Sequence, residues 1–134
     1  MSEKKLVRVV DVMKNDVHII DGMATIRDAI HLMKENQVKT LIVDRRHDND
    51  EYGILLVADI ARSVLAKDRS PERINVYEIM SKPVISVPPQ MDIRYCARMF
   101  SQFRLTRAPV IEDDKIIGMV SFTDMVLKGL YDLY

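Results

Sequence analysis

Hydrophobic residues recur along the chain in short runs whose spacing alternates between that of a strand and that of a helix. After an apolar segment over 7–13, the residues Val17, Ile19 and Ile20 predict a brief strand. A turn at Asp21-Gly22 precedes apolar positions at helical spacing over 26–36. Next come a strand over 41–43, a charged loop over 44–51, a strand over 52–56 and a helix carrying Ile60, Val64 and Leu65. The first half therefore predicts the order strand, helix, strand, strand, helix.

The second half repeats this order. Residues 76–80 echo 9–13, and further segments predict a strand over 84–87, a turn at Pro88-Pro89, a helix over 93–103, strands over 109–111 and 115–121, and a last helix over 122–133. Equivalent residues such as Met13 and Met80 or Val17 and Val84 lie 67 positions apart, and the spacing becomes 65 for Gly53 and Gly118 because the second copy has a shorter hairpin. A repeat of this length indicates a duplicated small domain. We expect one copy over 7–66, a polar linker over 67–75 and a second copy over 76–134.

Composition and charge narrow the class of protein. Hydrophobic residues make up 48% of the 134 and charged residues 30%, which is typical of a globular protein. Twenty basic residues balance 20 acidic ones, so the chain lacks the basic excess typical of nucleic-acid binding, and we expect no nucleic-acid partner. Neither a signal segment nor a membrane-spanning run is evident, which predicts a cytoplasmic protein without membrane contact. The single Cys96 lies in an apolar helical pattern and is expected in the core.

The segment from Gly118 to Asp124 offers two interpretations. Ser121 followed by Asp124, just before an apolar helical run, is the signature of a capping box, in which each side chain pairs with a free backbone N–H. The same hydroxyl and carboxylate could instead hold the phosphate and ribose of a nucleotide. A second capping box is expected at Thr25 and Asp28.

The duplication, the order of elements, the segment Ala108 to Glu112 and the Gly118 to Asp124 motif together resemble a pair of CBS domains, the Bateman module. The resemblance covers residues from about Val9 to Leu130. It implies an α+β fold of two tandem β-α-β-β-α repeats, packed sheet to sheet with pseudo-two-fold symmetry. It further implies a homodimer, and an adenine nucleotide bound in clefts between the copies.

The resemblance also implies which residues line each cleft. The first would combine Asp124, a ribose ligand, and Ser121, near phosphate, with Met119, Asp16, Val17, His18, Val38 and Lys39. The second, weaker cleft would combine Asp59 with Val84, Ile85, Leu105, Thr106 and Arg107. Leu56 stands in this cleft where the hydroxyl residue belongs, so we expect no capping box and no phosphate donor at Leu56.

Catalytic and metal-binding patterns are absent from the sequence. No Gly-rich phosphate loop or activated nucleophile is evident, and the three histidines have no metal-ligand spacing. The loop Arg45 to Asp50 is expected to be a solvated hairpin tip. We therefore expect a stand-alone regulatory module, not an enzyme, that requires no cofactor. It would sense AMP, ADP or ATP, with S-adenosylmethionine as a further ligand, and regulate a protein partner. The alternative is a dimerising interaction scaffold with vestigial clefts.

Overall fold

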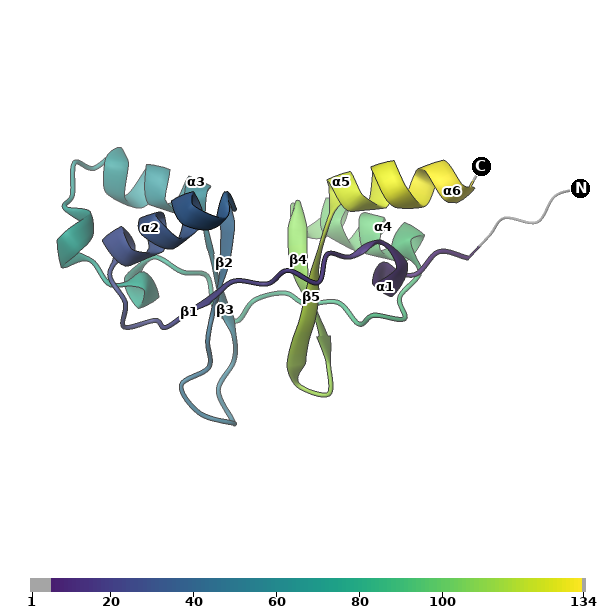
Figure 1. Ribbon diagram of the computed structural model, residues 1–134, viewed down its shortest axis with the longest axis horizontal. Helices are drawn as coiled ribbons and strands as arrows, with labels where there is room; N and C mark the ends of the chain where they lie inside the picture. Colours follow the sequence, from purple (N-terminus) through teal and green to yellow (C-terminus); the bar gives the residue numbers. More distant parts are fainter. Residues whose placement is uncertain (1–5, 134) are drawn as a thin grey trace, which may run out of the picture. The chain divides into compact units, whose positions relative to one another are not determined.

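A computed structural model describes residues 6–133 and divides into two compact units. Unit 1 combines the chain up to Val17 with residues 85–134, and unit 2 consists of residues 18–84. Both units contain helices and strands, which confirms the predicted mixed α and β class. In each unit the β-hairpin loop extends from one end of its strands while the helices lie toward the other end (Figure 1).

Unit 2 is built on a three-stranded sheet in the order β1-β2-β3. Its elements are β1 (Ile19–Ile20), α2 (Ile26–Asn36), β2 (Thr40–Val43), β3 (Gly53–Leu56), α3 (Val57–Ile60) with a π-helical continuation (Ala61–Leu65), and two 3₁₀ turns (Pro71–Arg73 and Val76–Glu78). Strand β1 pairs with β2 in parallel, and β2 with β3 antiparallel. These strands and helices confirm the order predicted for the first half.

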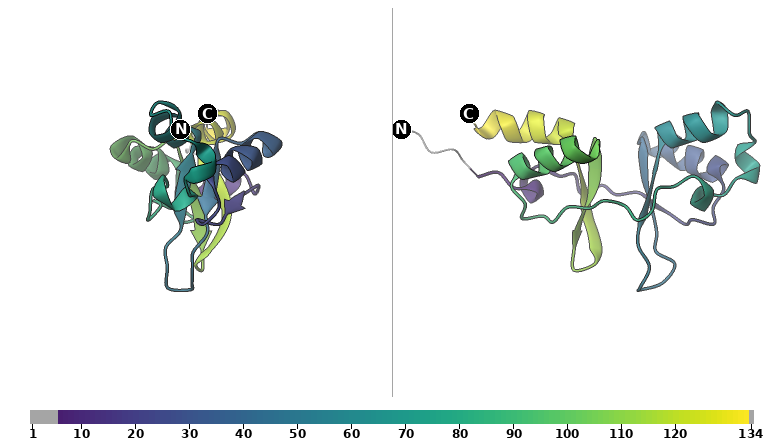
Figure 2. Two further views of the ribbon diagram at one scale, coloured as in Figure 1. Left: turned by 90° about the vertical axis from the view of Figure 1, so that its left-hand side faces the viewer. Right: turned by 180° about the vertical axis from the view of Figure 1, so that it is seen from behind.

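Unit 1 contains a two-stranded antiparallel sheet of β4 and β5. Its elements are α1 (Val9–Val12), α4 (Ile93–Phe103), β4 (Arg107–Glu112), β5 (Lys115–Ser121), and a last helix formed by α5 (Phe122–Asp124), a π-helical stretch (Met125–Leu130) and α6 (Tyr131–Leu133). Figure 2 shows α4 and the last helix from two further sides. The predicted helix over 93–103 is confirmed as α4. The turn between β4 and β5 has positive φ angles of 52° at Asp113 and 63° at Asp114.

Local chemistry explains where the long helices begin and end. Thr25 Oγ1 accepts a hydrogen bond from the Asp28 backbone N–H at 3.1 Å, and Asp28 Oδ2 accepts one from Thr25 N–H at 3.1 Å. This reciprocal pair is the capping box predicted for α2. Helix α4 is capped by Asp92, whose Oδ1 accepts from Arg94 N–H at 2.9 Å. Both helices end at a left-handed residue, Gln37 or Arg104.

The compact units do not coincide with the sequence repeats, because the short helical segment that begins each repeat packs on the other repeat. Val9 N–H donates to the Met91 carbonyl at 2.8 Å, so α1 belongs to the core of unit 1. Val76 N–H donates to the Ala24 carbonyl at 2.8 Å, and Val76 is fully buried in the core of unit 2. Each unit is therefore completed by a segment from the other repeat.

The strand predicted over 84–87 is wrong: the structure has a single parallel bridge there, between Val87 and Val110. The reason is that this segment passes from unit 2 to unit 1. Val84 N–H still donates to the Tyr52 carbonyl in unit 2 at 2.9 Å, whereas Val87 N–H donates to the Pro109 carbonyl in unit 1 at 3.1 Å. Two prolines follow directly and lack the N–H groups that would extend the ladder.

Candidate functional site

The motif at the end of β5 forms the capping box that the sequence predicts. Asp124 Oδ2 accepts hydrogen bonds from Ser121 N–H at 3.2 Å and from Ser121 Oγ at 2.9 Å, while the Asp124 N–H lies 3.1 Å from Ser121 Oγ. Asp124 is only 4% exposed and is the one buried charged side chain among residues 6–133. Burying a carboxylate is costly without partners, so its surroundings are informative.

Two lysines provide the positive charge beside this carboxylate. Lys14 Nζ lies 3.9 Å from Asp124 Oδ1, and Lys128 Nζ lies 3.8 Å from the same oxygen. The two oxygens of Asp124 thus have separate partners, because Oδ2 is engaged by Ser121. The lysine side chains are 65% and 50% exposed, so their ammonium groups remain accessible to solutes. We call Lys14, Ser121, Asp124 and Lys128 the Asp124 site.

A close backbone approach positions Lys14. Its N–H donates to the Met119 carbonyl at 2.8 Å, and Met119 N–H donates to the Lys14 carbonyl at 2.8 Å. The neighbouring Gly118 permits this pairing, because a Cβ at position 118 would lie 2.7 Å from the Lys14 carbonyl oxygen. Lys128 is positioned differently, four residues after Asp124 on the last helix.

Unit 2 contains a counterpart, the Asp59 site, which consists of Leu56, Asp59, Ser63 and Ser81. Ser81 occupies the position that Lys14 has in unit 1. Its N–H donates to the Ile54 carbonyl at 2.9 Å, and Ile54 N–H donates to the Ser81 carbonyl at 2.9 Å. Ser63 stands where Lys128 stands in the other copy. Unit 2 therefore keeps the carboxylate but has no lysine at either equivalent position.

The expectation for Leu56 needs one correction. The Leu56 side chain has no oxygen to accept a hydrogen bond from the helix. The Leu56 backbone N–H nevertheless donates to Asp59 Oδ2 at 2.9 Å. The half of the capping box that the carboxylate makes is therefore present, because it needs only a backbone donor. The half that a hydroxyl would make is lost, as the sequence indicates.

The predicted first-cleft residues are divided between the units. Asp16, Val17, Met119, Ser121 and Asp124 belong to unit 1, whereas His18, Val38 and Lys39 belong to unit 2. Within unit 1, Met119 is held against Lys14 by the backbone pair described above, and Asp16 follows two residues later. Within unit 2, the Lys39 carbonyl accepts from Val57 N–H at 3.0 Å, which places Lys39 beside the start of α3.

The residues predicted for the second cleft are also divided. Asp59 and Val84 lie in unit 2, and Ile85, Leu105, Thr106 and Arg107 in unit 1. The Thr106 carbonyl accepts from Phe122 N–H at 3.0 Å, and Arg107 is the register partner of Ser121. Within unit 1, Thr106 and Arg107 thus lie next to Ser121. The sequence-based assignment put Ser121 in the first cleft and these two residues in the second.

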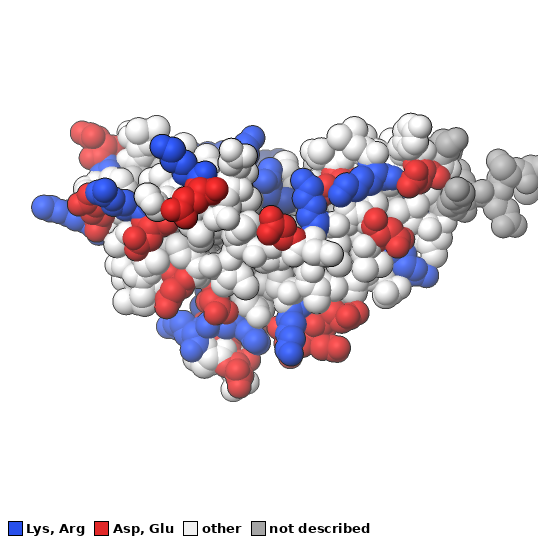
Figure 3. Space-filling model, in the orientation of Figure 1, with Lys and Arg blue, Asp and Glu red and all other residues white. Residues whose placement is uncertain are grey.

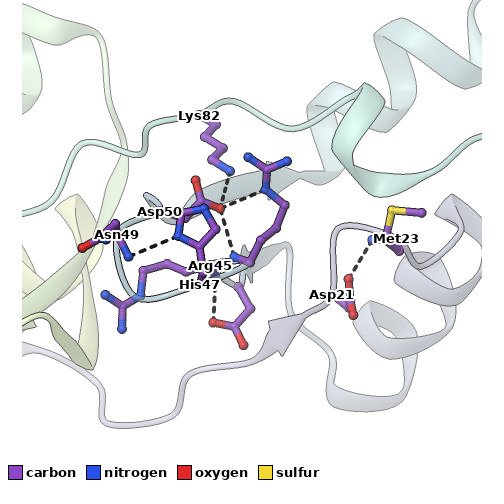
Figure 4. Close-up of polar contacts among 9 residues, drawn as sticks. Asp21, Met23, Arg45, His47, Asn49, Asp50 and Lys82 are labelled. Carbon is purple, nitrogen blue, oxygen red and sulfur yellow. Dashed lines mark hydrogen bonds and ion pairs between the residues drawn. The ribbon is translucent and has the colours of Figure 1, made fainter.

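The loop between β2 and β3 holds one largely covered carboxylate, Asp50. Asp50 Oδ2 accepts from Lys82 Nζ at 2.8 Å, as Figure 4 shows. The same oxygen accepts from Arg46 N–H at 2.9 Å. The Asp50 side chain is only 9% exposed, and its hydrogen bond from the Lys82 ammonium group holds the pKa of the carboxyl well below its usual range. A cavity of about 440 Å³ adjoins these residues and is also lined by Asp21, Asp44 and Tyr77. Residues 46–49 of the loop are exposed, as the sequence predicts, whereas the Asp50 side chain is largely covered.

Lys14 and Lys128 are the site residues that sequence reasoning missed. They lie far apart in the sequence, and neither belongs to the Gly118 to Asp124 motif. A signal was available for Lys128, because a lysine four residues after an acidic residue on a helix pairs with it. Lys14 carried no such signal, since its position depends on the backbone pairing with Met119.

Other classes of site find no support within residues 6–133. That part of the chain holds no group of three or more metal-ligating side chains. None of its helices is long and apolar enough to cross a membrane. Positive and negative side chains are interspersed on the face shown in Figure 3.

Two CBS domains are recognised in this chain, and solved structures of similar proteins share its fold. The family model of the CBS domain matches the chain twice, at residues 9–66 and 76–130. A hexameric CBS-CP12 protein from bloom-forming cyanobacteria is 40% identical, with a TM-score of 0.89 over 92% of this chain and 72% of that one. The CBS domain pair of a protein solved with 5′-methylthioadenosine and S-adenosyl-L-methionine is 20% identical, with a TM-score of 0.78 over 91% and 94% of the two chains, which shows a common fold.

Curated relatives include longer proteins. An uncharacterized protein of Methanocaldococcus jannaschii is 23% identical over 116 residues, which are 86% of this chain and 62% of that protein. An uncharacterized protein of Methanopyrus kandleri is 25% identical over 90% of this chain and 61% of that protein. The chain thus spans about three fifths of the length of these two relatives.

Proposed function

This chain belongs to the CBS domain family as a pair of tandem domains, a regulatory module, and we propose that it senses an adenosine-containing ligand at the Asp124 site. AMP, ADP and ATP are the proposed ligands, with S-adenosylmethionine as a further one. The observation that carries the proposal is the arrangement at Asp124: a buried carboxylate that keeps one oxygen toward two exposed ammonium groups.

The chemistry of this arrangement suits a nucleotide. A carboxylate can accept hydrogen bonds from the two hydroxyls of a ribose, and Oδ1 of Asp124 is not used by the capping hydrogen bonds. Ammonium groups beside it can neutralise phosphate charge. In the proposal Met119, Asp16 and Val17 contribute from unit 1, and His18, Val38 and Lys39 from unit 2. These contributions rest on the family resemblance.

The Asp59 site is proposed to bind the same ligand more weakly or not at all. Its carboxylate is retained, but Leu56, Ser63 and Ser81 replace the hydroxyl and both lysines of the other copy. Arg107, Thr106, Leu105, Ile85 and Val84 remain its proposed partners. The absence of a hydroxyl at position 56 is also the observation that favours the alternative function, an interaction scaffold with vestigial sites.

We further propose that the chain forms a homodimer and acts on a protein partner by a ligand-dependent change, without catalysing a reaction. An apolar groove of about 480 Å³ in unit 2 supports self-association, because two of the apolar residues that line it, Val57 and Leu65, are 44% and 78% exposed. The hexameric state of the cyanobacterial relative is a further indication that such chains assemble.

The Leu65→Lys variant should shift the mass measured by light scattering toward a monomer, and an unchanged dimer mass would place the interface elsewhere.

Isothermal titration calorimetry with AMP, ADP, ATP and S-adenosylmethionine tests the sensing function. We expect saturable binding that is lost in Asp124→Ala and retained in the matched variant Asp59→Ala. Light scattering with and without nucleotide should show a change in mass or shape on binding. Absence of heat with all four ligands would refute the nucleotide proposal and leave the scaffold as the function.

A further inference from the structure

We infer that Lys14 and Lys128 form a phosphate-binding pair that makes the Asp124 site selective for ligands carrying two or more phosphates. The nucleotide part of this inference rests on the proposed function, whereas the binding of a polyphosphate anion does not. Three observations carry it: within unit 1, the shared carboxylate oxygen and the exposure of both lysine side chains, and between the two copies, the difference in charge.

Geometry brings the two ammonium groups together. Both contact Asp124 Oδ1, at 3.9 and 3.8 Å, so they can be no farther apart than these two distances combined. A single carboxylate cannot neutralise two ammonium groups, and the three side chains carry one net positive charge. The excess charge attracts an anion, and a chain of phosphates is long enough to contact both ammonium groups at once.

The ion pairs of Lys14 and Lys128 with Asp124 are weak enough for a phosphate to replace the carboxylate as their partner. Distances near 4 Å are longer than a close charge-assisted hydrogen bond, and both lysines are at least half exposed, so the ion pairs are weak and screened. Asp124 would remain supported after the lysines turn to a phosphate, because Ser121 N–H and Oγ both donate to its other oxygen. The lysines can thus bind a phosphate while the buried carboxylate keeps its hydrogen bonds from Ser121.

The duplicated unit provides the comparison. At the positions equivalent to Lys14 and Lys128 it has Ser81 and Ser63, and the equivalent backbone pairing is kept. The other copy thus folds with serine at both positions, whereas in unit 1 Lys128 Nζ also donates a long hydrogen bond to the Val12 carbonyl at 3.5 Å. A structural role for the lysines in supporting the turn would be hard to reconcile with serine in the copy that folds in the same way.

The test uses sodium tripolyphosphate as a probe, measured by calorimetry at constant ionic strength. The variants are Lys14→Ser, Lys128→Ser and the double variant, which install the residues of the other copy. Lys115→Ser, an exposed lysine at the β4–β5 turn, is the control. Each lysine should contribute roughly fivefold to tenfold in affinity, so the double variant should bind tripolyphosphate roughly 25-fold to 100-fold more weakly, and the control within about twofold of wild type.

The nucleotide series separates this inference from the proposed function. Wild type should bind ATP about tenfold more tightly than AMP, and the preference should fall to within about threefold in the double variant. Tripolyphosphate binding that depends on both lysines, without any nucleotide binding, would refute the proposed function and support the anion pair. The inference is overturned if wild type does not bind tripolyphosphate or if the double variant binds it equally well. Circular dichroism of every variant confirms that the fold is kept.

Discussion

Replacing Gly118 by alanine should destabilise unit 1 and disturb the Asp124 site together. The added Cβ would lie 2.7 Å from the Lys14 carbonyl oxygen and 2.7 Å from Met13 Sδ. The thioether can rotate away, but the carbonyl belongs to the backbone pair with Met119 and can move only if that pair opens. The variant must therefore either strain the chain or lose the pairing.

The size of the effect follows from these contacts. Overpacking a tight site costs about 1–3 kcal/mol, and weakening two backbone hydrogen bonds costs about 1 kcal/mol each. Because the variant incurs one cost or the other, we expect a loss of roughly 1–3 kcal/mol in the free energy of unfolding, and a melting temperature lower by roughly 4–12 °C. Lys14 would also move away from Asp124, so binding of tripolyphosphate should weaken.

Thermal and urea unfolding followed by circular dichroism measure this loss. Gly22→Ala is the matched control, because a Cβ there would meet Val43 and Tyr77 at 3.4 and 3.5 Å, which is ordinary contact. We expect Gly22→Ala to stay within about 1 kcal/mol of wild type. If Gly118→Ala proved as stable as Gly22→Ala, the account of why glycine is needed beside Lys14 would be refuted.

Three further predictions concern single side chains. Ser121→Ala should lower the free energy of unfolding by about 1 kcal/mol, measured by urea titration, because it removes the capping hydroxyl; no loss would contradict the cap. Lys82→Met should raise the pKa of Asp50 toward its ordinary value in a carboxyl NMR titration, since the Lys82 hydrogen bond is the main cause of the lowering. An unchanged Asp50 pKa in the variant would refute the role of Lys82. In the wild type, the contribution of Asp50 to the free energy of unfolding should be complete above the ordinary carboxyl pKa of about 4 and should fall as the pH drops below it. Cys96, whose pKa burial raises to about 11, should react with iodoacetamide at pH 8 only after unfolding, and rapid labelling of the native protein would contradict its burial.

The sequence predicts those parts of the fold that depend on neighbouring residues. Helices α2 and α4 have their apolar spacing, caps and ends within a few positions, so the pattern predicts their location well. The capping box at Ser121 and Asp124 is equally local and is confirmed. These features need no knowledge of the rest of the chain.

Features that depend on distant segments could not be predicted in the same way. The pattern over 7–13 does not indicate that α1 packs on the second repeat, because that choice is made by contacts with Met91 and the core around it. The segment over 84–87 has strand-like residues but passes between units, so its ladder is interrupted. Lys14 reaches Asp124 through the backbone pairing with Met119, and the loop residue Asp50 is partly covered through its contact with the distant Lys82.

A crystal structure with ATP bound tests the central claim most directly. The account predicts electron density for the ribose hydroxyls at the Asp124 carboxylate and for phosphates at Lys14 and Lys128, with lower or no occupancy at Asp59. Density at a place that contacts none of these residues, or equal occupancy at Asp59 and Asp124, would contradict it.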